Sequence, residues 1–522
     1  MRFVACLAAI ALALPAPARA DGEAAARLAE YRNSPPLLRA FLYRMPKGGD
    51  LHNHLTGAAY AEATIRSAAA AGICVHPDTA KVSPQPCDPP LLPIAAAIKD
   101  ARLNERIVDA WSMRDFIPVA GLSGHDHFFD AFDRFRGAAA MGDLAAEVVN
   151  RAGRQRMRYI ELMATFQGDA VNALADDVNQ ATPWNANDPA AFEAALRTAQ
   201  IESLTAAASQ QIDALEQRRR EALGCGTAQA QPGCPVTVRW LQQVTRLMPA
   251  HRVFAQSLFG ELLAEHDTRV VGIDYVAAED DPKALAAYTE QMHMLDYLHS
   301  RMPKARISLH AGELTLGLVR PEDLLFHIRE AVELGHADRI GHGVDVMYED
   351  DAFGLLREMA DKRVAVEVNL TSNAQILGVE GKAHPFPVYL AAGVPVVLST
   401  DDEGIERTDR TNELERAVVT YNLSWQTLVD LERNTLEYAF VAGNSLWADT
   451  RAWRKVPACA GSAATRPPLP DCAAFLSGSE KARLQWDLER DLVNFDDEAR
   501  TLRPGREPAP HVISRSAPRG RS

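Results

Sequence analysis

The chain has 522 residues, of which 47% are hydrophobic and 24% charged, and its formal net charge is -14 at pH 7. This composition is that of an ordinary globular protein and excludes a disordered or fibrous chain. The acidic balance also argues against a nucleic-acid partner, because binding a phosphate backbone needs a clustered positive surface.

The first twenty residues have the pattern of a secretory signal peptide. Arg2 precedes an apolar stretch from Phe3 to Leu14, and the segment ends in the small-residue pattern Ala18-Arg19-Ala20. We therefore expect cleavage after residue 20 and a secreted or periplasmic mature protein. No later stretch reaches the roughly 18 consecutive apolar residues that span a bilayer, so no membrane partner is expected after removal of the signal.

Short apolar runs alternate with segments of helical periodicity along the rest of the chain. Eight runs are predicted as strands: Gly49 to His54, Arg158 to Met163, Thr237 to Gln242, Arg269 to Val276, Arg306 to His310, Arg339 to His342, Val364 to Leu370 and Pro395 to Thr400. Alternating strand and helix units predict a parallel sheet, and eight such units predict a closed (β/α)8 barrel of the TIM type.

Two insertions and a C-terminal helical extension lengthen this pattern. The first insertion, at about 59–110, follows strand one, and the second, at 167–235, follows strand two. A Pro-rich loop at 458–477 precedes a final helix expected around Lys481 to Thr501. We assign residues 21–505 to one barrel domain and residues 506–522, which are rich in Pro and Arg, to a disordered tail.

The cysteines also favour a secreted or periplasmic protein. Of the seven cysteines, Cys6 lies in the signal peptide, and the other six form sequence-close couples: Cys74 with Cys87, Cys225 with Cys234, and Cys459 with Cys472. Several connectivities are open, and we predict disulfides between the nearest neighbours. A thiolate zinc site is disfavoured because the sequence has no C-x-x-C spacing.

Histidines and an aspartate stand at the ends of predicted strands. His52 and His54 point to one face of strand one, while His310 and Asp401 follow strands five and eight. Barrel enzymes collect their catalytic groups at this edge. Three imidazoles and one carboxylate suit zinc better than magnesium or calcium, which prefer oxygen ligands. We therefore predict one Zn²⁺ per chain.

Five motifs occur in order between residues 45 and 405. They are M-P-K-G-G-D-L-H-N-H-L from Met45, S-L-H-A-G-E from Ser308, D-R-I-G-H-G from Asp338, N-L-T-S-N from Asn369 and L-S-T-D-D from Leu398. Together they resemble the adenosine deaminase family of metal-dependent hydrolases, and especially its secreted growth-factor-related branch. The resemblance implies a zinc aminohydrolase on a (β/α)8 barrel.

The resemblance also implies a role for individual residues. His342 and Asp401 match the residues that accept and orient the proton of the attacking water, which zinc makes more acidic. Glu313 matches the acid that protonates the purine ring nitrogen next to the amino-bearing carbon, so its pKa is expected to be raised. Asp402 matches the residue that hydrogen-bonds the imidazole-ring nitrogen of the purine.

Simpler interpretations exist for some of these side chains. Glu313 can be a solvated carboxylate at a helix start, and Asp402 can be a helix N-cap. A second H-x-H sequence, His125-Asp126-His127, has no partner motif and precedes four phenylalanines: Phe128, Phe129, Phe132 and Phe135. We interpret it as a helix start with a packing face and leave it out of the metal site.

Two substrate-binding positions depart from the family pattern. Thr56 stands where intracellular relatives carry an aspartate that meets a ribose hydroxyl. Recognition of the sugar is then expected from other groups, with the insertion at 167–235 as the candidate. Ala277 stands near strand four, where a glycine usually lets a backbone N–H approach the purine. An alanine allows the same approach if its φ is negative.

The leading hypothesis is zinc-dependent hydrolytic deamination of adenosine or 2′-deoxyadenosine to inosine or 2′-deoxyinosine plus ammonia. A deaminase of free adenine or of a modified adenosine is the near alternative. AMP is disfavoured as a substrate because no Lys/Arg cluster near the motifs would hold its phosphate. Cytidine-deaminase chemistry is excluded because the sequence lacks the P-C-x-x-C motif. A catalytically inactive extracellular binding protein is opposed by the presence of Glu313 and His342. A homo-oligomer is left open.

Overall fold

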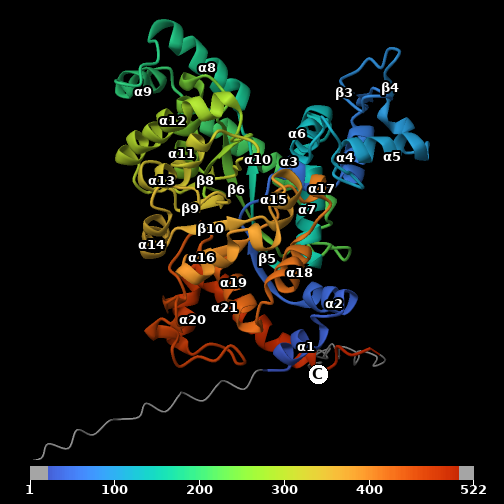
Figure 1. Ribbon diagram of the computed structural model, residues 1–522, viewed down its shortest axis with the longest axis vertical. Coiled ribbons are helices and arrows are strands. Elements are labelled where there is room, and N and C mark those ends of the chain that lie inside the picture. Colours follow the sequence, from blue (N-terminus) through green and yellow to red (C-terminus); the bar gives the residue numbers. More distant parts are fainter. Residues whose placement is uncertain (1–21, 505–522) are drawn as a thin grey trace, which may run out of the picture.

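The centre of the molecule is a sheet of eight parallel strands (Figure 1). The structure is a computed structural model that describes residues 22–504, so the signal-peptide and tail predictions lie outside the described residues. The strands pair in chain order: β1 (Lys47–Asp50), β5 (Met157–Ala164), β6 (Thr237–Thr245), β7 (Val270–Val276), β8 (Ile307–Ala311), β9 (Arg339–His342), β10 (Ala365–Val368) and β11 (Val396–Leu398). Each of the eight predicted strands overlaps an observed one, but β1 ends at Asp50, so His52 and His54 follow this strand instead of lying in it.

The sheet closes at its carboxyl edge through the segments that follow β1 and β11. The N–H of His54 donates to the carbonyl oxygen of Asp401 at 3.1 Å. The N–H of Asp401 donates to the carbonyl oxygen of His52 at 2.9 Å. Asn53 and Asp401 form a parallel bridge at the same place. The predicted (β/α)8 barrel is therefore confirmed, and the segments that join its first and last strands also carry predicted metal ligands.

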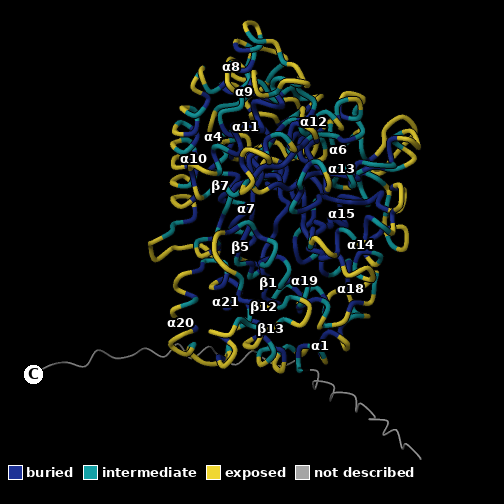
Figure 2. Tube along the Cα trace, turned by 90° about the vertical axis from the view of Figure 1, so that its left-hand side faces the viewer, coloured by how far each residue is buried: buried dark blue, intermediate teal, exposed yellow. Residues whose placement is uncertain are grey.

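Helices connect the strands and cover the outside of the barrel, as a parallel sheet requires. They are α7 (Met141–Arg154), α11 (Ala250–His266), α12 (Pro282–Arg301), η2 (Pro321–Leu324), α13 (His327–Glu333), α14 (Ala352–Lys362), α15 (Leu370–Ile376), η3 (Gly381–Ala383), α16 (Phe386–Ala392), α17 (Glu403–Glu406), α18 (Arg410–Tyr421) and α19 (Trp425–Glu437). In α7, Leu144, Val148 and Ala152 recur every four residues and are buried, so this face packs on the barrel. Figure 2 shows the barrel interior buried and the outer turns exposed.

The segment between β1 and α7 forms a small unit with its own apolar core. It contains α3 (Leu55–Ala58), α4 (Ala61–Ala70), β2 (Cys74–Val75), β3 (Val82–Ser83), β4 (Leu92–Pro93), η1 (Ile94–Ala96), α5 (Ala101–Ala110) and α6 (Gly124–Phe135). Its core includes Ile65, Ile107 and Phe128, and it is joined to the barrel loops by Ile376 and Ile405. This unit lies beside the barrel mouth, with β3 and β4 protruding (Figure 1).

Residues 167–235 form helices on the outside of the barrel. These are α8 (Gly168–Ala181), α9 (Pro189–Thr198) and α10 (Ser203–Ala222), of which α8 packs on α11 and α10 on α7.

Helices and two short strands complete the two ends of the described chain. They are α1 (Glu23–Tyr31) and α2 (Pro35–Arg44) at the start, and β12 (Trp447–Asp449), β13 (Arg454–Lys455), η4 (Pro457–Cys459), α20 (Pro470–Ser477) and α21 (Glu480–Ala499) at the end. The three predicted disulfides are present: Cys74–Cys87, Cys225–Cys234 and Cys459–Cys472. None of the helices within 22–504 combines the length and the apolar character needed to cross a membrane.

A fully buried ion-pair network lies inside the barrel. Arg339 in β9 donates from Nη2 to Glu161 in β5 at 2.6 Å and from Nε to Glu367 in β10. Its Nη1 also donates to the carbonyl oxygen of Tyr438 at 2.9 Å, and its guanidinium carbon lies 3.6 Å from the ring centre of Phe440. One cation thus joins three strands and compensates two buried carboxylates.

We predict that Arg339→Met lowers the free energy of unfolding by about 3 to 5 kcal/mol, because it leaves two buried carboxylates without their cation. Arg306→Met is the control. The Arg306 side chain is 57% exposed beside Asp338, and its loss should cost less than about 1 kcal/mol. Urea denaturation of both variants checks this, and equal losses would contradict the importance given to the buried network.

Candidate metal centre and active site

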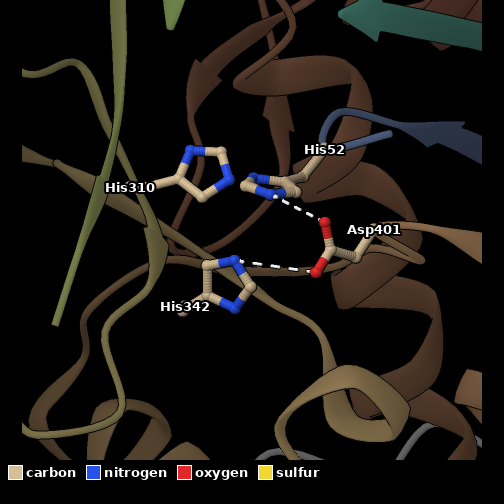
Figure 3. Close-up of side chains that lie close together, drawn as sticks. All are labelled: His52, His310, His342 and Asp401. Carbon is tan, nitrogen blue, oxygen red and sulfur yellow. Dashed lines mark ion pairs between the residues drawn. The ribbon is translucent and has the colours of Figure 1, made fainter. Parts of the chain in front are cut away.

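Four imidazoles and one carboxylate converge at the carboxyl edge of the barrel. His52, His310, His342 and Asp401 point toward one another (Figure 3), and a ligand atom of each lies within 4.8 Å of the others. His54 joins this group, since its Nε2 lies 3.1 Å from Nε2 of His310 and 3.3 Å from Oδ1 of Asp401. The structure thus brings together all four residues predicted as ligands. It also places the predicted catalytic histidine, His342, among them.

The free nitrogens of this group fit a metal ion. Nδ1 of His52 lies 2.7 Å from Glu367, and Nδ1 of His310 lies 2.8 Å from Asp274. A carboxylate that holds the proton on Nδ1 leaves the lone pair of Nε2 for a metal, which is the usual arrangement around zinc ligands. Nε2 of His52 is buried and forms no hydrogen bond within the described part of the chain. Nitrogen and carboxylate donors together suit zinc.

The backbone is strained at two of these residues. His342 has φ 67° and Asp401 has φ 55°, both in the left-handed region that favours glycine. Each such conformation costs about 1 to 3 kcal/mol and persists where the surrounding structure holds it. Strain of this kind concentrates at functional sites.

Glu313 lies beside this group on the loop after β8. Its Oε1 is 3.4 Å from Nδ1 of His342, and its side chain is only 10% exposed. Burial raises the pKa of Glu313 well above its usual value, and the negative charges of Asp401 and Glu279 add to this effect. Glu313 is therefore neither solvated nor at a helix start, so the simpler interpretation of this residue fails.

The loop that carries Glu313 is held by a second carboxylate. Glu279 accepts hydrogen bonds from the N–H groups of Gly312 at 3.1 Å and Glu313 at 2.8 Å, and it contacts Nδ1 of His327 at 2.6 Å. Glu279 is fully buried, and these bonds hold its pKa at about 2 despite the opposing effect of burial. The position of Glu313 is thus fixed through its backbone.

Asp402 directly follows Asp401 and is buried. It occupies the N-cap position of α17, but its side chain makes no capping bond. Its Oδ1 has no hydrogen-bond partner among residues 22–504. A buried oxygen without a partner is costly, so a bound ligand is a natural partner for it.

These side chains form the inner end of a cavity of about 790 Å³. Thr56 and Ala277 line the same cavity, and α6 supplies an apolar wall from Phe128, Phe129, Phe132 and Phe135. Residues 167–235 contribute nothing to the lining. The expectation that this insertion recognises the sugar is therefore wrong, because its helices pack on the outside of α7 and α11 instead.

Ala277 does not meet the condition of a negative φ, since its φ is 88°. The alanine therefore keeps the backbone conformation that a glycine would adopt. The physical reason lies two residues further on, where Glu279 is fixed by its bonds to the Glu313 loop. The chain must turn sharply after β7 to bring that carboxylate inside.

The residues that orient the histidines were not predicted from the sequence. Asp274 and Glu367 hold His310 and His52, and the side-chain amide of Gln243 lies 3.0 Å from Nδ1 of His54. A signal for two of them was present, because Asp274 and Glu367 are single acidic residues inside apolar strands. A buried strand tolerates such a residue only where it finds a partner.

Comparison with known proteins shows the family of the chain. The model of the adenosine deaminase family matches residues 122–446, so the chain belongs to this family. The adenosine deaminase of Mycobacterium ulcerans is 31% identical over 220 residues, which cover 40% of this chain and 56% of that protein. The adenosine deaminase of Vibrio atlanticus is 32% identical over 138 residues, which cover 26% of this chain and 38% of that protein. The chain thus spans about half the length of the curated relatives it matches.

Solved structures show the same fold. Arabidopsis N6-mAMP deaminase is 20% identical, with a TM-score of 0.50 over 78% of this chain and 96% of the other. Arabidopsis ADAL complexed with GMP is 19% identical, with a TM-score of 0.50 over 78% of this chain and 95% of the other. Membership of the secreted growth-factor-related branch stays a prediction.

We predict that Ala277→Gly raises the free energy of unfolding by about 1 kcal/mol, because glycine adopts a positive φ without strain. Ala278→Gly is the matched control and should lower it by about 0.5 to 1 kcal/mol, since only the entropy cost of glycine remains. Thermal and urea denaturation compare the two variants. A loss of stability in Ala277→Gly would contradict the strained conformation.

Proposed function

We propose that the protein is a zinc-dependent hydrolase that deaminates adenosine or 2′-deoxyadenosine. Water replaces the amino group, so the products are inosine or 2′-deoxyinosine and ammonia. The observation that carries this proposal is the buried Glu313 carboxyl, which lies beside the histidine and aspartate cluster at the inner end of the cavity. A pure binding protein has no need of a buried acid next to such a cluster.

His52, His54, His310 and Asp401 are the proposed ligands of one zinc ion. When bound, zinc acts as a Lewis acid that lowers the pKa of a water molecule toward neutrality. The carboxylates of Glu367 and Asp274 keep two of these imidazoles in the tautomer that leaves Nε2 free.

The remaining side chains act on the purine and on the water. Glu313, kept protonated by burial, gives its proton to the purine ring nitrogen next to the amino-bearing carbon. That carbon then becomes a better electrophile. His342, whose Nε2 lies 3.8 Å from Oδ2 of Asp401, is the proposed acceptor of the proton of the attacking water. Asp402, whose Oδ1 has no hydrogen-bond partner within residues 22–504, is the proposed partner of the imidazole-ring nitrogen of the purine.

The cavity lining favours a neutral substrate over a phosphorylated one. Besides Glu313, which burial keeps protonated, five aspartates line it: Asp133, Asp280, Asp281, Asp401 and Asp402. Among the described lining residues Arg136 is the one guanidinium, and its side chain is 78% exposed. A phosphate would meet net repulsion here, so adenosine is favoured over AMP. Free adenine or a modified adenosine stays the alternative, because Thr56 offers no carboxylate to a ribose.

We also propose that the mature protein is secreted or periplasmic. Three disulfides support this, since disulfides persist in oxidising compartments.

We predict that Glu313→Gln lowers kcat for adenosine by about 10² to 10⁴-fold, because the amide fills the same space but has no acidic proton. Glu322→Gln, which changes an exposed glutamate on η2, serves as the control and should leave kcat unchanged. Steady-state absorbance assays measure both. A kcat for Glu313→Gln within about tenfold of the wild type would exclude the proposed role.

We predict one zinc ion per chain in the purified protein, measured by elemental analysis. His310→Ala should lose most of this metal, because one imidazole ligand is removed. His336→Ala, at a histidine that pairs with Asp296 on the surface, should keep it. Full activity in a preparation free of transition metal would end the zinc proposal.

A further inference from the structure

One polar pair in the cavity has no part in the proposed chemistry. Nε2 of His125 lies 3.0 Å from Oδ1 of Asp280, and the two residues are 155 positions apart in the sequence. His125 is in the first turn of α6, and Asp280 is in the loop between β7 and α12. Both line the cavity, with side chains 17% and 16% exposed. The pair therefore joins two walls of the substrate cavity.

Asp280 keeps an oxygen available for a ligand. Its Oδ1 takes the contact with His125, whereas Oδ2 accepts no hydrogen bond within the part of the chain that the structure describes. The neighbouring Asp281 differs, because its carboxylate caps α12 by accepting from the N–H of Lys283 at 2.8 Å. A carboxylate offers about four lone-pair sites, so the contact with His125 orients Asp280 without saturating it.

The position of Asp280 suits the part of a nucleoside that extends beyond the purine. Asp280 lines the same cavity as Glu313 and Asp402. With the purine between Glu313 and Asp402, the sugar must lie elsewhere in the same cavity. Thr56 is exposed there, and its hydroxyl makes no hydrogen bond within residues 22–504.

We propose that Asp280, oriented by His125, accepts a hydrogen bond from a ribose hydroxyl and replaces the carboxylate that Thr56 does not provide. This inference rests on the proposed function, because it needs a purine nucleoside in the cavity. A hydrogen bond from a hydroxyl to a carboxylate is roughly twice as strong as a neutral one. The substrate class is therefore a purine that carries its sugar, rather than free adenine.

The competing explanation is a simple tie between α6 and the loop after β7. A partly exposed ion pair of that kind contributes only about 0 to 1 kcal/mol. Such a tie would affect every ligand of the cavity equally. A sugar contact affects only ligands that carry a sugar, so a comparison of two ligands separates the explanations.

The test uses the full mature chain and the variants Asp280→Asn and His125→Gln. Titration calorimetry gives the dissociation constants of inosine and of 9-methylhypoxanthine, which has the same base without a sugar. We expect Asp280→Asn to weaken inosine binding by about tenfold or more and to change binding of 9-methylhypoxanthine by less than about twofold. His125→Gln keeps an N–H donor and should weaken inosine binding less. The kcat/KM for adenosine should fall in parallel.

Asp126→Asn is the control. It removes the other carboxylate near His125, since Oδ1 of Asp126 lies 3.7 Å from Nδ1 of His125. Asp126 does not line the cavity. In this variant the ratio of the dissociation constants of inosine and 9-methylhypoxanthine should equal that of the wild type. An equal loss for both ligands in Asp280→Asn, or no loss for either, would overturn the inference. A wild type that binds inosine but deaminates no nucleoside would overturn the proposed function alone, and one that does not bind inosine would overturn both.

Discussion

The buried guanidinium of Arg339 is the interaction on which the rest of the site depends. It compensates the charges of Glu161 and Glu367 inside the barrel, and Glu367 in turn holds Nδ1 of His52. Without the cation, Glu367 would be a buried charge with a strong tendency to take up a proton. A protonated Glu367 would no longer fix the tautomer of His52. The ion pair thus links the stability of the barrel to the orientation of a metal ligand.

The mouth of the barrel combines closure, ligation and strain in few residues. The backbone of Asp401 joins the first and last strands while its carboxylate faces the imidazoles. Left-handed conformations at His342, Asp401 and Ala277 each cost stability that the surrounding hydrogen bonds must offset. At Asp401 the same bonds close the barrel, so the strain of this residue is held by the fold itself. A site arranged in this way is organised before its ligands bind.

Much of this architecture follows from the sequence. Most of the strands were predictable because apolar runs with β-branched residues end in polar ones, whereas β1, with the sequence Lys-Gly-Gly-Asp, has no such run. His52, His310 and Asp401 follow strands, at the edge where barrel enzymes place their catalytic groups. The pairing of the cysteines was predictable from their closeness in the chain.

Other features depend on contacts between distant segments and could not be derived locally. The contact of His125 with Asp280 joins residues far apart in the chain, and no periodic pattern in the sequence predicts it. The positive φ of Ala277 results from the anchoring of Glu279, which only the folded barrel shows. The role of residues 167–235 was misjudged because the length of an insertion does not say on which side of the barrel it packs. Here α6 shares a core with Ile376 and Ile405 at the mouth, whereas α10 packs on α7.

The most direct test of the central claim is a product balance with adenosine. The purified mature chain is incubated with adenosine, and inosine and ammonia are quantified in the same sample. We expect equal amounts of the two products, loss of both after chelation, and return of both when zinc alone is added back. A zinc-loaded, folded protein that releases no ammonia from adenosine or 2′-deoxyadenosine would contradict the central claim.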